Sequence, residues 1–61
     1  MKYIVTYNVE EDASETKFKV TFEGIVAHDA DTAVDLAEDR VWKAFSLAEY
    51  TFELDTVQEM K

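Results

Sequence analysis

Residues 25–34 read Ile-Val-Ala-His-Asp-Ala-Asp-Thr-Ala-Val, and within this stretch the spacing of the apolar side chains changes. Up to Ala27 the apolar residues follow the two-residue period of a β-strand, and from Ala30 onward they recur at helical spacing. Asp29 stands at the change. Its carboxylate can accept the free amide hydrogens of a first helical turn, so it is the predicted N-cap. The stretch therefore predicts a strand that leads directly into a helix.

The predicted helix has an apolar stripe made mainly of small side chains. At 100° per residue the stripe is roughly 120° wide, and its small residues would let the helix lie close to a sheet. Asp31 follows in the first turn, where the helix dipole favours negative charge. No Gly or Pro marks the end, which is expected between Phe45 and Glu49. The stripe consists of Ala30, Ala33, Val34, Ala37, Val41, Ala44, Phe45 and Ala48.

Strands are predicted on both sides of this helix because apolar and polar residues alternate there. Two strands joined as a hairpin precede the helix, and Gly24 is predicted to form a bulge or bend in the second. A third strand follows the helix from Tyr50 to Asp55, and Val57 is its candidate continuation. The inward residues are expected to be Tyr3, Val5, Tyr7 and Val9, then Phe18, Val20 and Phe22, and finally Tyr50, Phe52 and Leu54.

The order strand, strand, helix, strand indicates an α+β fold. A right-handed crossover from the second strand to the third places the third beside the first. We therefore expect a β-β-α-β domain with a three-stranded antiparallel sheet in the order 2-1-3 and one helix on one face. The predicted core combines Val5, Tyr7, Phe18, Val20, Phe22, Val34, Val41, Phe45 and Phe52.

Length and composition favour a binding protein over an enzyme. The 61 residues form one predicted domain, 1–61, which leaves little room for the deep cleft that small-molecule sites need. The chain has no cysteine, one glycine and one histidine, so thiolate chemistry and glycine-rich phosphate loops are excluded. His28 is expected to be structural. We predict no catalytic residues, no metal site and no cofactor.

Charge is the strongest signal in the composition. Fourteen Asp and Glu residues oppose six Lys and Arg, giving a net charge of −8. Such a surface repels nucleic acids and anionic membranes and attracts basic proteins, although it also simply aids solubility. The start of the chain is too short and too polar for a signal peptide, and no stretch is long and apolar enough for a membrane span. A cytoplasmic location is therefore expected.

The helix is predicted to carry an acidic face opposite its apolar stripe. One helical turn rises about 5.4 Å, so successive carboxylates would stand about 6 Å apart, similar to the spacing of phosphates along a DNA strand. Like charges at i and i+4 weaken a helix slightly, which favours a functional interpretation over an ordinary solvated face. The predicted face comprises Asp31, Asp35, Glu38, Asp39 and Glu49.

Two further features belong to the candidate surface. Trp42 falls among the helix carboxylates, where it would be either an exposed interface anchor or a side chain folded over the helix edge. A second acidic cluster is predicted in the loop between the first two strands and includes Glu10, Glu11, Asp12 and Glu15. Leu36 and Leu47 share another flank of the helix, where they would either cap the core or form a dimer contact.

Two stretches resemble segments of the small acidic proteins that lytic bacteriophages make early to take over the host. Residues 27–38, Ala-His-Asp-Ala-Asp-Thr-Ala-Val-Asp-Leu-Ala-Glu, resemble a strand-to-helix junction of that family. Residues 52–57 resemble the final strand of phage inhibitors of bacterial RNA polymerase. In size and acidity the chain is most similar to Bacillus-phage DNA mimics that inhibit the nucleoid-associated protein HU. This resemblance implies a protein that occupies the DNA-binding surface of HU in the host cytoplasm.

Three functions are compatible with these observations. The first is a DNA mimic that binds a basic HU-like protein of a bacterial host and displaces DNA. The second is an inhibitor of a host enzyme such as RNA polymerase, in which a local patch around Trp42 outweighs the total charge. The third is an accessory module whose acidity only keeps it soluble. The expected partners exclude nucleic acid and membranes, and a homodimer is expected through the outer sheet face and the strand edges.

Overall fold

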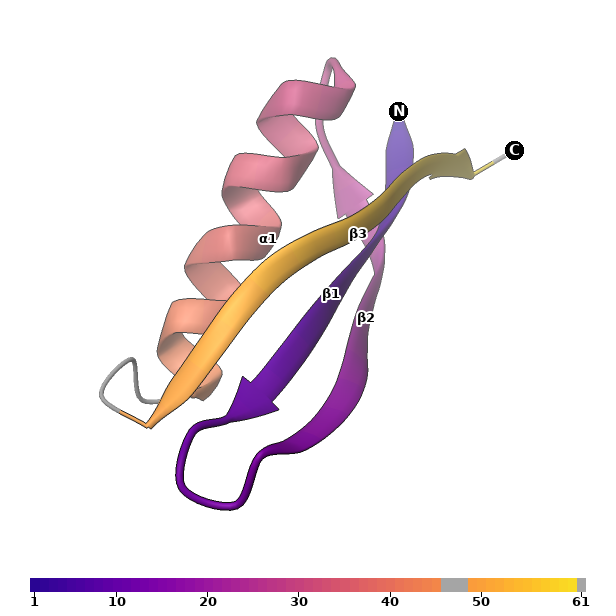
Figure 1. Cartoon of the computed structure of the whole chain (residues 1–61). Helices are drawn as coiled ribbons and strands as arrows, with labels where there is room; N and C mark the ends of the chain where they lie inside the picture. Colours follow the sequence, from indigo (N-terminus) through magenta and orange to yellow (C-terminus); the bar gives the residue numbers. More distant parts are fainter. Residues whose placement is uncertain (46–48, 61) are drawn as a thin grey trace.

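The computed structural model describes residues 1–45 and 49–60. It contains β1 (Lys2–Glu11), β2 (Thr16–Val26), α1 (Ala30–Ala44) and β3 (Tyr50–Met60). The strands form an antiparallel sheet in the order β2-β1-β3, and α1 covers one face of it (Figure 1). The predicted α+β class, strand order and single helix are confirmed.

The core lies between α1 and the central strand. Every second residue of β1 is buried, and Val5 has no exposed surface. The helix contributes Ala33, Ala37 and Val41, all with no exposed surface. Two of these side chains are methyl groups, so the helix axis can approach the sheet closely. One short helix is therefore enough to bury the inward residues of the central strand. The buried residues that form the core are Tyr3, Val5, Tyr7, Val9, Ile25, Ala27, Ala33, Ala37 and Val41.

One predicted core position, Phe18, and one residue of the predicted apolar stripe, Ala44, are wrong. Phe18 is 37% exposed, since it lies at the hairpin end of the sheet, opposite Val9, where the helix stops. Ala44 is exposed because it is the last residue of the helix and lies beyond Val41, the last buried residue of the stripe. Val34, Phe45 and the inward residues Val20, Phe22 and Phe52 are half-buried around the core. Ala48 lies outside the described residues.

Both edge strands contain a bulge where they pair with β1. Gly24 adopts φ +73°, and the pairing shifts between Tyr3↔Ile25 and Val5↔Phe22, as predicted for this glycine. A second shift, absent from the prediction, lies between Thr6↔Thr56 and Tyr7↔Leu54. Asp55 is the extra residue there. The bulge turns Val57 toward the core, and β3 runs through Val57, its candidate continuation, to Met60.

The molecule is elongated, with Cα extents of 37 × 17 × 14 Å. The two chain ends lie side by side at one end of the sheet, where Lys2 pairs with Met60 (Figure 1). The β1–β2 hairpin loop lies at the opposite end. In the described part of the chain, no helix combines the length and the apolar character needed to cross a membrane.

Candidate protein-binding surface

The helix presents its predicted acidic residues to solvent. Asp31, Asp35, Glu38 and Asp39 are all exposed, on the side turned away from the buried stripe of α1. We call these four residues the acidic helix face. Their spacing follows from the helix itself, which rises about 5.4 Å per turn and so sets carboxylates about 6 Å apart. The structure thus brings together four of the five carboxylates that the sequence assigned to this face.

One carboxylate of this face is neutralised within the chain. The Lys43 ammonium lies 2.9 Å from Asp39, in an i,i+4 pair near the end of the helix. Among residues 1–45 and 49–60, no basic side chain lies within 4.0 Å of the carboxylates of Asp31, Asp35 or Glu38. These three charges are therefore directed to solvent and can attract a basic partner.

Asp29 begins the helix, as the sequence predicted. Its carboxylate accepts a hydrogen bond from the Thr32 backbone amide at 2.8 Å. This amide hydrogen bond, together with the Thr32 side chain and the neighbouring His28, lowers the pKa of Asp29 from its ordinary value. Its charge caps the helix and is not a further member of the acidic helix face.

Trp42 was predicted to be either an exposed interface anchor or a side chain folded over the helix edge. It is 54% exposed, so each of these interpretations is partly right. On one side it lines a shallow hollow of about 300 Å³ with Asp35, Glu38 and Asp39. On the other side it lines a hollow of about 290 Å³ between the helix and β3, which includes Leu54. Trp42 therefore separates the acidic helix face from an apolar groove.

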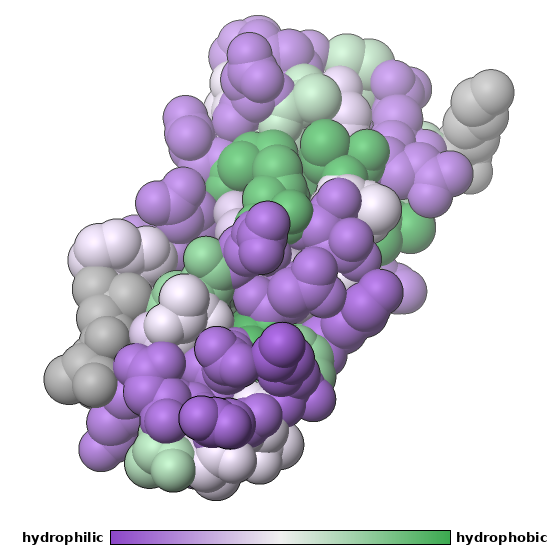
Figure 2. Space-filling model, in the orientation of Figure 1, coloured by the Kyte–Doolittle hydropathy of each residue, from purple (hydrophilic) through white to green (hydrophobic). Residues whose placement is uncertain are grey.

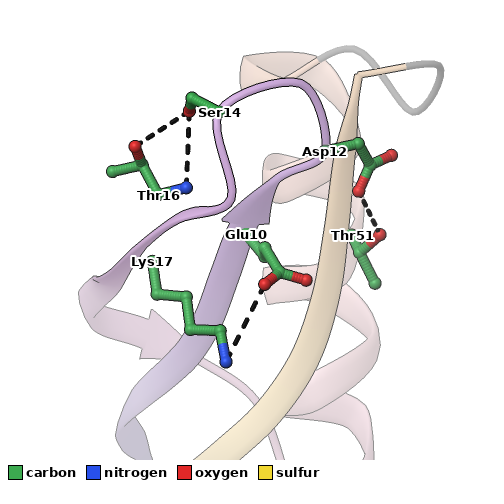
Figure 3. Close-up of polar contacts among 6 residues, drawn as sticks. All are labelled: Glu10, Asp12, Ser14, Thr16, Lys17 and Thr51. Carbon is green, nitrogen blue, oxygen red and sulfur yellow. Dashed lines mark hydrogen bonds and ion pairs between the residues drawn. The ribbon is translucent and has the colours of Figure 1, made fainter.

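Three of the four predicted loop carboxylates make contacts within the hairpin or with β3, and Figure 3 shows two of them. Glu10 lies 3.8 Å from the Lys17 ammonium, and Asp12 accepts a hydrogen bond from the Thr51 hydroxyl at 2.9 Å. Glu11 accepts hydrogen bonds from the hydroxyls of Ser14, at 2.8 Å, and Tyr50, at 3.3 Å. Because these carboxylates have partners within the chain, the loop is a weaker candidate for binding than the helix.

The two remaining acidic candidates, Glu15 and Glu49, make hydrogen bonds through their backbone groups. Glu15 adopts φ +56°, in the left-handed region, and its amide donates to the Glu11 carbonyl. Glu49 lies beyond the helix, and its carbonyl accepts a hydrogen bond from the Asp12 amide at 2.9 Å. The predicted place of Glu49 on the acidic helix face is wrong, because the helix ends at Ala44 with Phe45 as its C-cap. Leu47 lies outside the described residues, and Leu36 is 43% exposed.

The outer face of the sheet is polar and largely self-paired. Lys19 lies 3.1 Å from the Asp55 carboxylate, and the hydroxyls of Thr6 and Thr21 lie 3.1 Å apart. Together with the pair between Glu10 and Lys17, these contacts balance charge across the strands. This face therefore lacks the excess of negative charge that the helix presents.

The described residues offer no cluster of side chains suited to hold a metal ion. Residues 1–45 and 49–60 contain no group of three or more His, Cys, Asp or Glu side chains arranged to hold a metal ion. His28 is exposed, and its Nε2 lies 3.1 Å from Asp29. The histidine therefore lies beside the carboxylate that caps the helix.

Sequence reasoning missed the apolar groove beside Trp42. Phe52 and Leu54 were predicted to point toward the helix, which they do, but Leu54 is still 42% exposed. A single helix is narrower than three strands, so inward residues of an edge strand are only partly covered. The sequence did indicate that one helix would leave part of a three-stranded sheet uncovered. It did not indicate which edge of the sheet would be uncovered.

Comparisons with protein-family models, with curated proteins and with solved structures find no match for this chain.

Proposed function

We propose that this protein is a DNA mimic that binds the basic DNA-binding surface of a nucleoid-associated protein of the HU type and displaces DNA from it. The observation that carries the proposal is the exposed acidic helix face, in which Asp31, Asp35 and Glu38 are directed to solvent. Carboxylates at about 6 Å intervals form a charge pattern similar to that of a phosphate backbone. The Lys and Arg side chains of a DNA-binding protein would meet this pattern in place of phosphates.

The shape and total charge of the molecule support the same function. Its long dimension of 37 Å is close to one turn of duplex DNA, about 34–36 Å. A net charge of −8 on so small a body speeds the approach of a basic protein. The same charge disfavours direct binding of nucleic acid.

The test is a titration in which the protein displaces a labelled DNA duplex from purified HU. A triple variant, Asp31→Asn, Asp35→Asn and Glu38→Gln, removes the solvent-directed charges and leaves Asp39 paired with Lys43. A matched variant, Glu15→Gln, Glu23→Gln and Glu49→Gln, removes the same number of charges from exposed positions outside the helix and β3. The helix variant should require about tenfold more protein for displacement, and the matched variant should stay within about threefold of the parent.

Equal losses in the two variants would mean that only total charge matters, and no displacement by the parent would rule out mimicry of DNA at HU. Circular dichroism of both variants checks that the fold persists. The helix variant is expected to remain folded, because it relieves the like-charge pair between Asp31 and Asp35.

The exposed Trp42 favours a second candidate, inhibition of a host enzyme such as RNA polymerase through a local apolar contact. In that case Trp42→Ala should weaken partner binding more than the triple charge variant does. A pull-down from bacterial lysate followed by identification of the bound proteins separates the two: a small basic nucleoid protein supports mimicry, and polymerase subunits support the alternative.

A further inference from the structure

A groove runs between the helix and β3, and it is apolar inside and acidic at its rim. Its volume is about 290 Å³. Figure 2 shows apolar surface where α1 and β3 meet, with hydrophilic side chains around it. The side chains that matter most are Val34, Val41 and Trp42 from the helix, Phe52 and Leu54 from β3, and Glu38 at the rim.

This groove adjoins an open strand edge. In the described part of the chain, β3 pairs with β1 on one side and with no strand on the other. Backbone amides and carbonyls along such an edge can accept another strand. A strand added there would lie about 4.8 Å from β3 and would direct alternate side chains toward the helix. Those side chains would enter the groove beside Leu54 and Trp42.

The charges around the edge specify what kind of strand fits. Between Tyr50 and Met60 the strand β3 carries Glu53, Asp55 and Glu59 and no Lys or Arg, and of these three only Asp55 is paired within the described residues, with Lys19. Glu38 lines the groove beside β3. The other edge strand, β2, carries two lysines and one carboxylate, Lys17, Lys19 and Glu23, so it offers a basic strand less negative charge than β3 does. A second copy of this chain would bring more carboxylates to the β3 edge, so a basic occupant is favoured.

We propose that the groove and the edge of β3 together bind an extended segment of the partner, in which apolar residues alternate with Lys or Arg. The segment adds to β3 as a fourth strand, inserts its apolar side chains between Trp42 and Leu54, and directs its basic side chains toward Glu53 on the outer face. This inference rests on the proposed function in one respect, the basic character of the partner, and names the form in which that partner binds.

The probe is a synthetic eight-residue peptide in which Lys and Val alternate, added to the intact, isotope-labelled protein. Trp42 is the only tryptophan, so its fluorescence reports directly on the groove. Binding should shift the Trp42 emission to shorter wavelength and slow hydrogen exchange of the β3 amides that do not bond to β1. Amides of β2 should exchange as before.

Two altered peptides test the two parts of the proposal. A peptide with Glu in place of Lys should not bind, because it meets like charge along β3. A peptide methylated at alternate backbone nitrogens should bind at least about tenfold more weakly, because it cannot complete the strand pairing. Equal binding of the methylated peptide, or binding that leaves β3 exchange unchanged, would overturn the proposal. So would protection of the β3 edge by self-association in the protein alone.

Leu54 and Leu36 provide a matched pair of variants, since they are 42% and 43% exposed on different elements. Leu54→Ser should weaken peptide binding about tenfold, whereas Leu36→Ser should change it less than about twofold. The HU titration keeps the two proposals apart. If the peptide binds as described but DNA is not displaced, only the proposed function fails. If DNA is displaced equally well by Leu54→Ser and the peptide does not bind, only this inference fails.

Discussion

Tyr7 connects the two layers of the domain through its hydroxyl group. The ring is buried in the core, and the hydroxyl donates a hydrogen bond to the Val34 carbonyl in the helix at 3.1 Å. Burial, with the negative charges of Glu38 and Asp35, raises the pKa of Tyr7 above its ordinary value. The buried phenol therefore stays protonated at a pH where an exposed one ionises.

We expect Tyr7→Phe to lower the free energy of unfolding by about 1 kcal/mol at pH 7, because the Val34 carbonyl loses a partner. Since the folded pKa is raised, stability falls as pH rises above roughly 10, where the unfolded chain loses the proton first. The advantage of the parent over the variant should therefore shrink at alkaline pH. Urea denaturation of both proteins at pH 7 and above pH 10 measures this. An advantage that grows with pH would show that the phenol is ionised in the fold.

Glu15 has a left-handed backbone conformation that disfavours a side chain. Its φ of +56° costs a residue with a Cβ roughly 1 kcal/mol, and glycine adopts it without that cost. Glu15→Gly should therefore raise the free energy of unfolding by about 0.5–1 kcal/mol. Glu15→Ala is the control, because it removes the same charge but keeps the Cβ. If the two variants were equally stable, charge and not backbone conformation would account for the change.

At the scale of the elements, the helix depends on its first turn. Asp29→Ala removes the acceptor for the Thr32 amide, so the variant should melt a few degrees lower at pH 7. Asp29→Asn should keep most of the stability, because its amide oxygen can accept the same hydrogen bond. Because the pKa of Asp29 is lowered in the fold, its contribution is present above the unfolded value of about 3.9 and is lost as pH falls through the folded value. Thermal melts at pH 7 and pH 2.5 should show the parent and Asp29→Ala converging at the lower pH.

Phe45 is the C-cap of the helix, and aromatic rings from the sheet pack around its side chain. Its ring centroid lies 5.1 Å from that of Tyr50, 5.8 Å from Phe18 and 6.0 Å from Phe52. Phe45→Ala should cost about 2–3 kcal/mol, less than the about 3–5 of a fully buried phenylalanine, because Phe45 is half-buried. Chemical denaturation checks this value. A variant as stable as the parent would mean that these rings do not support the helix end.

The elements could be predicted because each has a clear period, and the errors lie where a period breaks. Gly24 marks its bulge by residue type, since glycine adopts positive φ without strain. Asp55 carries no such mark, so the second bulge was not foreseen, nor was the extension of β3 beyond Val57 to Met60. The helix end, predicted between Phe45 and Glu49, was wrong, because the helix ends at Ala44. Without Gly or Pro the sequence offered no stop signal, and Glu49 was placed on a helix that ends before it.

At the scale of the whole molecule, the excess of negative charge should be felt as self-repulsion. With a net charge of −8, raising NaCl from 20 to 200 mM (about 0.02 to 0.2 M) should screen repulsion and raise the free energy of unfolding by roughly 1 kcal/mol or less. Equilibrium denaturation at several salt concentrations measures it. The triple helix variant should show a smaller salt effect, and a parent whose stability falls with salt would indicate that its ion pairs outweigh repulsion.

The candidate site was predictable in part. Helical spacing alone places Asp31, Asp35, Glu38 and Asp39 on one exposed face, so those residues could be named from the sequence. Which carboxylates already have partners depends on contacts between distant residues, such as the ion pair of Asp55 with Lys19 and the hydrogen bond of Asp12 with Thr51. Such contacts follow from the register of three strands, which periodicity does not determine. The sequence therefore found the charges but not which of them are already engaged.

The strand order also governs the sequence of events as the chain is synthesised. β1 is made first yet occupies the centre of the sheet, and its pairing with β2 can form as soon as the hairpin has left the ribosome. Its other edge can pair only after β3 has been made, so until then the central strand of the nascent chain has one open edge. Any truncation before Tyr50 makes that transient state permanent and leaves β1 open to pairing with other chains.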